Sequence, residues 1–229
     1  MDSPKIIFQD ENILVIDKPA GWIVNESTNT STNPVLQDWL SQNFDYQIAK
    51  EKEVRSGIVH RLDKETSGVL LVAKNIQTFE KLQFEFAQRK VQKTYTALAH
   101  GKVEPKTGTI NEKIGRLPWK RTKFGVWEGG REAQTDYKVL DYYSKEGKDY
   151  TLLELYPKTG RTHQIRVHLK HIGHPIVSDP LYSGRKTNRQ DRKWCPRLFL
   201  HASNLSILNL NFKSDLPSDL KSALNSFHD

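Results

Sequence analysis

Apolar runs separated by polar and turn-forming residues dominate the first third of the chain. The runs IIF and ILVI flank QDEN and precede DKPAGW, so residues 6–24 are predicted to form a pair of strands that ends in a Pro-Gly turn. A polar loop is expected over 27–34, and PVLQDWLSQNF after it has apolar residues at helical spacing. The continuous apolar run GVLLVAK at 68–74 fits a buried strand.

The middle of the chain carries the clearest helical pattern. In NIQTFEKLQFEFAQRK, Phe79, Leu82 and Phe86 recur at i, i+3 and i+7, which predicts an amphipathic helix. Asn75 is expected to cap the first turn, because its side-chain oxygen can accept a hydrogen bond from a backbone N–H that lacks an intrahelical partner. The segment KTYTALAHGKV at 93–103 is rich in β-forming residues and is predicted to be a strand.

The second half of the chain is predicted to contain strands, polar segments and one helix. Residues 104–131 are turn-rich and basic, and AQTDYKVLDYY and DYTLLELYP indicate two strands joined by SKEGK. An apolar stripe in RTHQIRVHLKHIG predicts a helix that ends at Gly173. A basic loop over 183–197 is expected next, and LFLHASNLSILNL is expected to be a late strand.

The order of these elements indicates the fold class. Strands and helices do not alternate regularly, which argues against a doubly wound parallel sheet and favours an α+β domain with a largely antiparallel sheet. The 229 residues are enough to bury a substantial core. The length fits one large domain or two small lobes, and the sequence shows no solenoid-type repeat and no low-complexity block. Of these alternatives, a single domain over residues 1–229 is expected.

Charge and cysteine content narrow the possible functions. Lys and Arg total 35 against 27 Asp and Glu, giving a net charge of +8, which fits a polyanionic partner about as well as a generally basic surface. The single cysteine, Cys195, excludes an intramolecular disulfide and a cysteine-based zinc site. The N-terminal apolar runs are too short for a signal peptide or a membrane span. We therefore expect a cytoplasmic monomer with no membrane partner.

The stretch VHRLDKETSGVLL at 59–71 places a carboxylate between two cations, directly before the predicted buried strand. Asp63 could simply begin a turn that ETSG completes, which is a common role of Asp. However, the apolar strand begins within five residues, and Arg61 and Lys64 would keep a partly buried carboxylate ionised. An ionised carboxylate held beside a rigid strand can act as a nucleophile or a general base, and both roles stay open.

The helix predicted over 161–173 carries cations and histidines. Arg161, Arg166 and Lys170 are either a solvated basic face or donors directed at phosphates or a carboxylate. The Thr-Gly before them could present backbone N–H groups to an anion. Several histidines suggest a metal site, but no HExxH pattern occurs and no acidic residue lies in this segment. His168 is therefore expected to be a core-edge histidine, and no metal is expected.

Two loops interleave basic residues with aromatic rings. EKIGRLPWKRTKFGVW carries Lys120, Arg121 and Lys123 near Trp119, and SGRKTNRQDRKWCPR carries six cations beside Trp194. Cations contact phosphates and rings stack on unpaired bases when proteins hold looped or single-stranded RNA. Two such loops make nucleic acid the leading partner, and the three cations of the first loop are expected to contact it.

Several blocks of the sequence together resemble the RluA-type family of RNA pseudouridine synthases. HRLDKETSG at 60–68 is similar to the active-site signature of the family, and DENILVIDKPAGWIV at 10–24 to its opening strand and KPxG turn. KTYTALAHGKV, GREAQTDYKVL, LYPKTGRTHQIRVHLKHIGHPIVSDPLY and RLFLHA resemble further blocks in the order of the family. The resemblance therefore covers most of the chain.

The resemblance implies a mixed, mainly antiparallel sheet flanked by helices with a central RNA-binding cleft, and no separate N-terminal RNA-binding domain. It implies isomerisation of uridine to pseudouridine in ribosomal or transfer RNA, with no cofactor and no metal. By match of motif position, Asp63 would be the catalytic aspartate and Tyr95 the aromatic residue that lies against the target base. Arg166 would pair with the aspartate. Arg61 would fill the space that the flipped base leaves, and Arg161 would contact RNA.

Two other functional classes compete with an isomerase. A catalytically silent RNA-binding or ribosome-assembly protein could share the fold, but the presence of Asp63, Tyr95 and Arg166 argues against it. A metal-dependent hydrolase that uses the histidines would need acidic ligands that the segment lacks.

Overall fold

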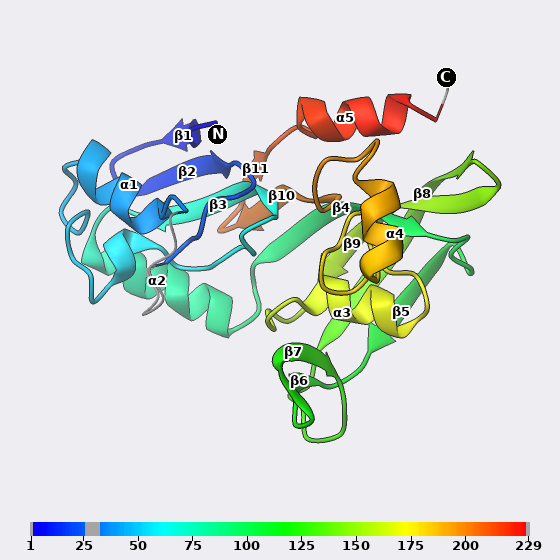
Figure 1. Cartoon of the computed structure of the whole chain (residues 1–229). Coiled ribbons are helices and arrows are strands. Elements are labelled where there is room, and N and C mark those ends of the chain that lie inside the picture. The colour runs from blue at the N-terminus through cyan, green and yellow to red at the C-terminus, as the bar shows by residue number, and fades with distance from the viewer. Residues whose placement is uncertain (1, 26–32, 228–229) are drawn as a thin grey trace. The chain divides into compact units, whose positions relative to one another are not determined.

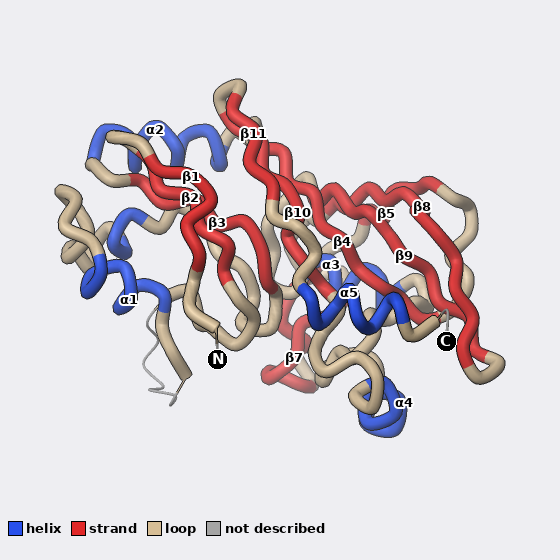
Figure 2. The backbone as a smooth tube through the Cα atoms, turned by 90° about the horizontal axis from the view of Figure 1, so that it is seen from above, coloured by secondary structure: helices blue, strands red, loops and turns tan. Residues whose placement is uncertain are grey.

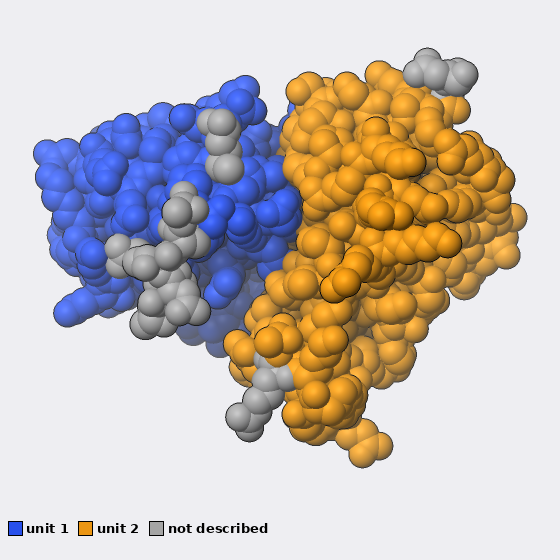
Figure 3. Space-filling model, viewed as in Figure 1, with its two compact units in different colours: residues 1–92, 202–215 blue, residues 93–201, 216–229 orange. Residues whose placement is uncertain are grey.

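The computed structural model describes residues 2–25 and 33–227, so the polar loop predicted over 27–34 lies largely outside the described residues. The chain divides into two compact units, coloured in Figure 3: unit 1 holds residues 1–92 and 202–215, and unit 2 holds residues 93–201 and 216–229. The single domain expected over residues 1–229 stays a prediction.

Unit 1 is built on a sheet with the strand order β1-β2-β3-β10, and β11 extends it beyond β10. The pairs β1–β2, β2–β3 and β10–β11 are all antiparallel. The elements are β1 (Lys5–Gln9), β2 (Ile13–Lys18), α1 (Leu36–Asn43), a 3₁₀ turn (Arg55–Gly57), β3 (Ser67–Ala73), α2 (Ile76–Ala87), β10 (Leu200–Ile207, in unit 1 from Ala202 onward) and β11 (Leu210–Lys213).

The core of unit 1 forms where α2 packs on this sheet (Figure 1). Every residue of β3 is buried, and the apolar face of α2 contributes Phe79 and Leu82 to the same cluster as Leu71. The predicted Asn75 cap is confirmed, since its side chain accepts a hydrogen bond of 2.8 Å from the Thr78 N–H. Strand β3, which precedes α2, is therefore packed against this helix in the core of unit 1.

Unit 2 contains a second set of antiparallel strands in the order β4-β9-β8-β5, which lie side by side in Figure 2. A separate hairpin, β6–β7, projects from the chain between β5 and β8. The elements are β4 (Gln92–His100), β5 (Thr107–Asn111), β6 (Ile114–Leu117), β7 (Lys120–Val126), β8 (Gln134–Lys145), β9 (Lys148–Pro157), α3 (Gln164–His171), α4 (Arg185–Asp191) and α5 (Ser218–Asn225).

Helix α3 and the loop that follows it pack against these strands. Leu169 of α3 and Ile176 of the following loop are fully buried with Leu153 of β9 and Leu98 of β4. The hairpin predicted through SKEGK is present, and Glu146 and Gly147 at its turn both have positive φ angles, of 51° and 70°. These are the dihedrals that a tight two-residue β-hairpin turn requires.

The α+β class with a mainly antiparallel sheet is confirmed, and three local predictions are wrong. The turn-rich segment 104–131 contains the strands β5, β6 and β7, and the basic loop 183–197 contains α4. The late strand predicted to 210 ends at Ile207 and turns into β11. Within the described part of the chain, no helix has the length and apolar character that crossing a bilayer requires.

Candidate active site

Asp63 lies half-buried in a short turn that leads into β3. The Thr66 N–H donates a hydrogen bond of 3.1 Å to the Asp63 carbonyl, and β3 begins at Ser67. The predicted turn is therefore confirmed, and it presents the carboxylate at the end of a fully buried strand. Arg61, two residues earlier, is exposed.

Lys18 ties this turn to the Pro-Gly turn after β2. Its side chain is fully buried, and its ammonium donates to the carbonyls of Pro19 at 2.9 Å, Trp22 at 3.1 Å and Lys64 at 3.2 Å. The Gly21 N–H also donates to the Lys64 carbonyl, at 2.8 Å. A buried ammonium must be compensated by such acceptors, so the backbone beside Asp63 is held by a cation that the sequence pattern did not single out.

The residue before Arg61 anchors the other side of the segment. His60 Nε2 accepts a hydrogen bond of 2.9 Å from the Leu71 N–H, and its ring stacks on Phe86 of α2 at a centroid distance of 4.9 Å. The segment from His60 to Thr66 is thus attached to β3 and α2 at its start and to the Lys18 turn near its end.

Gly68 is required where β3 passes β10. Its φ angle is +118°, and a Cβ atom there would lie 2.2 Å from the Ala202 carbonyl oxygen. Only glycine fits a positive φ together with such a close approach. The last residue of the HRLDKETSG signature is therefore fixed by packing within unit 1.

Tyr95 and Lys93 share one face of β4 in unit 2, because side chains two residues apart on a strand point to the same side. Tyr95 is half-buried and pairs with Leu155 of β9. The Lys93 ammonium lies 3.4 Å from the Thr159 carbonyl, and burial lowers the pKa of this lysine to about 8. A lysine that titrates near neutral pH beside the predicted aromatic residue was missed by the sequence reasoning.

Arg166 is buried in α3 and does not belong to a solvated basic face. Its side chain is 4% exposed, and Nε and Nη2 donate to the two oxygens of Asp179 at 2.8 and 2.9 Å. Of the two alternatives, a donor directed at a carboxylate therefore describes Arg166, and a solvated position describes Lys170, which is exposed. Arg166 belongs to unit 2 and Asp63 to unit 1, and their predicted pairing stays a prediction.

The Thr-Gly turn before α3 is occupied by the protein's own side chains. Gln164 Oε1 accepts from the Arg161 N–H at 3.0 Å and from the Thr159 hydroxyl at 2.6 Å. The Arg161 guanidinium donates through Nε to the Glu132 carbonyl at 3.0 Å. Of the N–H groups predicted to bind an anion, that of Arg161 is therefore already bonded to Gln164. Arg161 itself is half-buried.

His168 is a core histidine, as predicted. It is fully buried, with Nδ1 2.9 Å from the Thr135 hydroxyl and Nε2 3.1 Å from the Glu112 carbonyl. Burial is the main cause that lowers its pKa, which favours the neutral ring. Both ring nitrogens therefore have protein partners.

The three cations predicted to contact RNA differ in their surroundings. Lys120 is exposed, next to Trp119 at the tip of the β6–β7 hairpin, and the Trp119 side chain is 74% exposed. Lys123 instead donates to the Leu181 carbonyl at 2.6 Å and lies 5.9 Å from the centre of the Tyr182 ring. The side chain of Arg121 lies outside the described part of the chain.

The second basic and aromatic segment divides between structural contacts and an exposed basic surface, to which Arg185, Lys186, Arg189 and Lys193 belong. Trp194 packs edge-on against Tyr150 and Phe227, at centroid distances of 5.5 and 5.2 Å. Arg192 donates to the Pro196 and Ser178 carbonyls, and Arg197 pairs with Asp219. The Trp194 ring, which was expected to stack on RNA, is therefore half-buried and packs against Tyr150 and Phe227 of its own unit.

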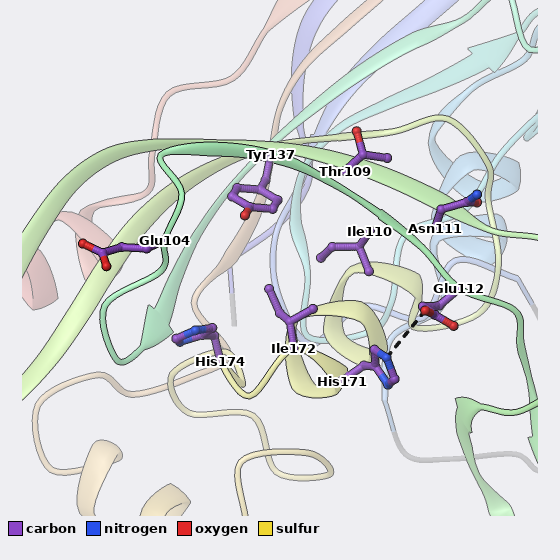
Figure 4. Close-up of a pocket in the computed structure, with 9 residues that line it drawn as sticks. All are labelled: Glu104, Thr109, Ile110, Asn111, Glu112, Tyr137, His171, Ile172 and His174. Atoms are coloured by element: carbon purple, nitrogen blue, oxygen red, sulfur yellow. Dashed lines mark ion pairs between the residues drawn. The ribbon is translucent and has the colours of Figure 1, made fainter.

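An open cavity of about 250 Å³ lies elsewhere in unit 2, beside β5, β8 and the end of α3 (Figure 4). The Tyr137 phenol and the Ile172 side chain point into it, and His171 Nε2 lies 3.8 Å from a carboxylate oxygen of Glu112. None of its lining residues is a predicted site residue. The predicted chemistry is thus not located in this cavity.

Comparison with known proteins gives a consistent result. The family model described as RNA pseudouridylate synthase matches residues 12–171. The "Ribosomal large subunit pseudouridine synthase D" of Buchnera aphidicola is 37% identical to 96% of this chain, which spans 72% of that relative. The protein of the same name from Pseudomonas aeruginosa is 37% identical over 94% of this chain, which spans 69% of it.

Two solved human structures share the fold. RNA pseudouridylate synthase domain containing 1 matches 96% of this chain and 87% of its own, with a TM-score of 0.75 and 28% identity. RNA pseudouridylate synthase domain containing 4 matches 97% and 92%, with a TM-score of 0.73 and 26% identity. Both similarities extend over the two units described above.

Proposed function

Because the chain belongs to the family of RNA pseudouridine synthases, we propose that it isomerises a uridine of structured ribosomal RNA with Asp63 as the catalytic carboxylate. The resemblance seen in the sequence motifs is confirmed by the family match. Ribosomal RNA is the proposed substrate because relatives that are 37% identical are named for the large ribosomal subunit.

The reaction places clear demands on the protein. The N1–C1′ bond must break, the uracil must turn, C5 must bond to C1′, and the C5 proton must leave. A stacked base cannot undergo these steps, so the nucleotide has to leave the helix, at a cost of a few kcal/mol. Asp63 meets the central demand as a carboxylate at a fixed place, acting as nucleophile or as base.

The other residues divide the remaining tasks. Tyr95 packs on the face of the uracil, a role that a half-buried ring on the rigid strand β4 can fill. Arg166 orients the Asp63 carboxylate and favours its ionised form. Arg61, which is exposed next to the signature turn, fills the space that the extruded base leaves.

RNA contact is assigned mainly to the tip of the β6–β7 hairpin. The exposed Trp119 ring provides a face for an unpaired base, and the neighbouring Lys120 provides a charge for a phosphate. Lys123 is assigned a supporting role, because its ammonium already donates to the Leu181 carbonyl. Arg121 and Arg161 complete the proposed RNA contacts.

The observation that carries this proposal is the position of Asp63 in a segment that is attached to β3 through His60 and to the Lys18 turn through the Lys64 carbonyl. Asp63→Asn removes the charge and keeps the shape. It is expected to abolish the release of tritium from RNA labelled at C5 of uridine. RNA affinity should stay within about tenfold, because phosphate contacts dominate binding.

The matched control is Glu65→Gln, which removes a carboxylate two residues away in the same turn. This variant is expected to keep wild-type turnover. Retained turnover in Asp63→Asn would contradict the assignment of the catalytic carboxylate. A wild-type protein that binds RNA without releasing tritium would instead identify a silent RNA-binding protein.

A further inference from the structure

Arg166 and Asp179 form a fully buried ion pair in unit 2. Two parallel hydrogen bonds, Nε to Oδ2 at 2.8 Å and Nη2 to Oδ1 at 2.9 Å, join side chains that are 4% and 0% exposed. A bidentate pair of this kind fixes the plane of the guanidinium as well as its position. The side edge of the Arg166 group is therefore held by Asp179.

Asp179 is itself held in place by the loop that contains it. Its Oδ1 accepts hydrogen bonds from the Leu181 N–H at 2.9 Å and the Tyr182 N–H at 3.1 Å. The Ser183 hydroxyl donates to the Asp179 carbonyl at 2.7 Å. The carboxylate is thus the immobile half of the pair, and the arginine orients to it.

Tyr182 covers the pair from the same loop. The Arg166 guanidinium lies 5.1 Å from the centre of its ring, and the Tyr182 hydroxyl lies 3.0 Å from His163 Nδ1. Lys123 of β7 fastens the loop from outside through the Leu181 carbonyl. Residues of α3, β7 and the loop at 178–183 therefore immobilise one guanidinium together.

Stability alone gives little reason for such an arrangement. Burying an ion pair desolvates both charges, and well-packed apolar residues often replace such pairs without loss of stability. A guanidinium held by its Nε side, however, keeps its end-on edge in a fixed direction, and that edge matches a second carboxylate. The geometry fits a guanidinium that is held in place so that it can orient a second carboxylate.

We propose that Asp179 is a positioning residue, which holds the Arg166 guanidinium in the orientation that the catalytic carboxylate requires. This inference rests on the proposed function, in which Arg166 serves Asp63. Asp179 itself touches no reacting atom. It acts only through Arg166, so its substitution should matter only when Arg166 is present.

The first test is Asp179→Asn, which keeps the shape of the side chain and removes its charge. Because misplacing a positioning group by about 1 Å lowers rates by about 100-fold, kcat is expected to fall between about tenfold and a hundredfold. KM for a large-subunit ribosomal RNA transcript is expected to change less than about threefold, since phosphate contacts set RNA affinity. An unchanged kcat would overturn the proposal.

A double-mutant cycle separates positioning from general support of the fold. Asp179→Asn is measured in the wild type and in an Arg166→Lys background, in which the bidentate pair no longer exists. If Asp179 acts through Arg166, its substitution lowers kcat by less than about twofold in that background, because coupled residues are not additive. Equal losses of kcat in both backgrounds would overturn the proposal.

The matched control is Asp219→Asn. Asp219 also forms a bidentate pair with an arginine in unit 2, in which Arg197 Nε donates to Oδ2 at 2.5 Å and Nη2 donates to Oδ1 at 3.1 Å. Its substitution is expected to lower the melting temperature and leave kcat unchanged at a temperature well below melting. An equal fall of kcat in both aspartate variants would assign Asp179 a merely structural role.

Two further results keep the outcomes distinct. Should Asp179→Asn fail to fold, Asp179→Glu keeps the charge and displaces the guanidinium, and kcat must then fall more than about tenfold for the proposal to stand. The proposed function fails if the wild-type protein releases no tritium or if the Arg166→Lys variant keeps full kcat. Both results are obtained with Asp179 unchanged. Failure of the positioning role would appear only in the Asp179 variants.

Discussion

Lys93 couples the stability of the protein to pH. Burial lowers its pKa from 10.5 to about 8 in the folded protein, so between these values the unfolded chain binds more protons than the folded chain. Stability therefore rises with pH across this window and is lowest below about pH 8, where a charged amine must be buried. The slope for one proton is at most about 1.4 kcal/mol per pH unit.

The prediction is tested by urea unfolding of the wild type and of Lys93→Met between pH 7 and 10.5. The wild type is expected to gain stability relative to the variant as the pH rises above about 8. Taking the difference cancels the tyrosines that titrate in both proteins. Lys138→Met, on the exposed face of β8, serves as the control and should show no such gain. A constant difference between wild type and Lys93→Met would contradict the prediction.

The role of a single residue could be predicted where its chemistry is local. The Asp63 turn is encoded in thirteen consecutive residues, and its position before a buried strand was predicted correctly. The partners of Lys18 and Arg166 could not be predicted, because Lys64 and Asp179 lie 46 and 13 residues away in the sequence. Two signals could have drawn attention to Lys18: it ends an apolar run, and it is the lysine of the KPxG turn.

At the scale of secondary-structure elements, the close passage of β3 and β10 depends on Gly68. A Cβ atom at this position would meet the Ala202 carbonyl at 2.2 Å, and the φ angle of +118° adds strain. Gly68→Ala is therefore expected to destabilise the protein by about 3 kcal/mol or more. The measurement is the free energy of unfolding from chemical denaturation.

Gly147 provides a matched control for this substitution. Its φ angle is +70°, and a Cβ atom there would have no heavy atom within 4 Å. Gly147→Ala therefore isolates the backbone strain, which is about 1–2 kcal/mol. Equal losses in the two variants would show that strands β3 and β10 separate easily and that the close approach is not required.

Elements with an internal pattern were predictable, and elements held by distant contacts were not. Helix α2 has both an apolar period and a capping Asn75. Helix α4 has almost no apolar residues and is stabilised by Asp191, whose side chain accepts from the Ser178 N–H and binds His100. The strands β6 and β7 lie in a basic stretch without a clear alternation of apolar and polar residues, and they pair with each other.

At the scale of the whole molecule, the net charge of +8 predicts salt-sensitive RNA binding. Neutralising Lys120 and Arg121 together should lower RNA affinity and reduce the slope of log affinity against log salt by about 1 to 2, since each phosphate contact contributes about 0.7–0.9. The measurement is a binding titration at several salt concentrations with the same RNA.

Two controls define the contribution of the hairpin tip. Lys221→Gln changes an exposed lysine of α5 and should leave the slope nearly unchanged. Lys123→Gln should reduce the slope less than either tip residue, because this ammonium is bound to a carbonyl of its own chain. An unaltered slope in the Lys120 and Arg121 double variant would show that the hairpin does not contact RNA.

The division of the chain between the units has a consequence for its synthesis. Unit 1 consists of the N-terminal part of the chain together with residues 202–215. This later segment supplies β11 and most of β10, which is the neighbour of β3 in the sheet. About 130 residues separate the end of β3 from Ala202, which at 5–20 residues per second leaves roughly 6 to 26 seconds on the ribosome. During that interval β3, whose residues are all buried in the folded protein, has an unpaired edge. The nascent chain is therefore expected to depend on chaperones that cover this edge while unit 2 is being made.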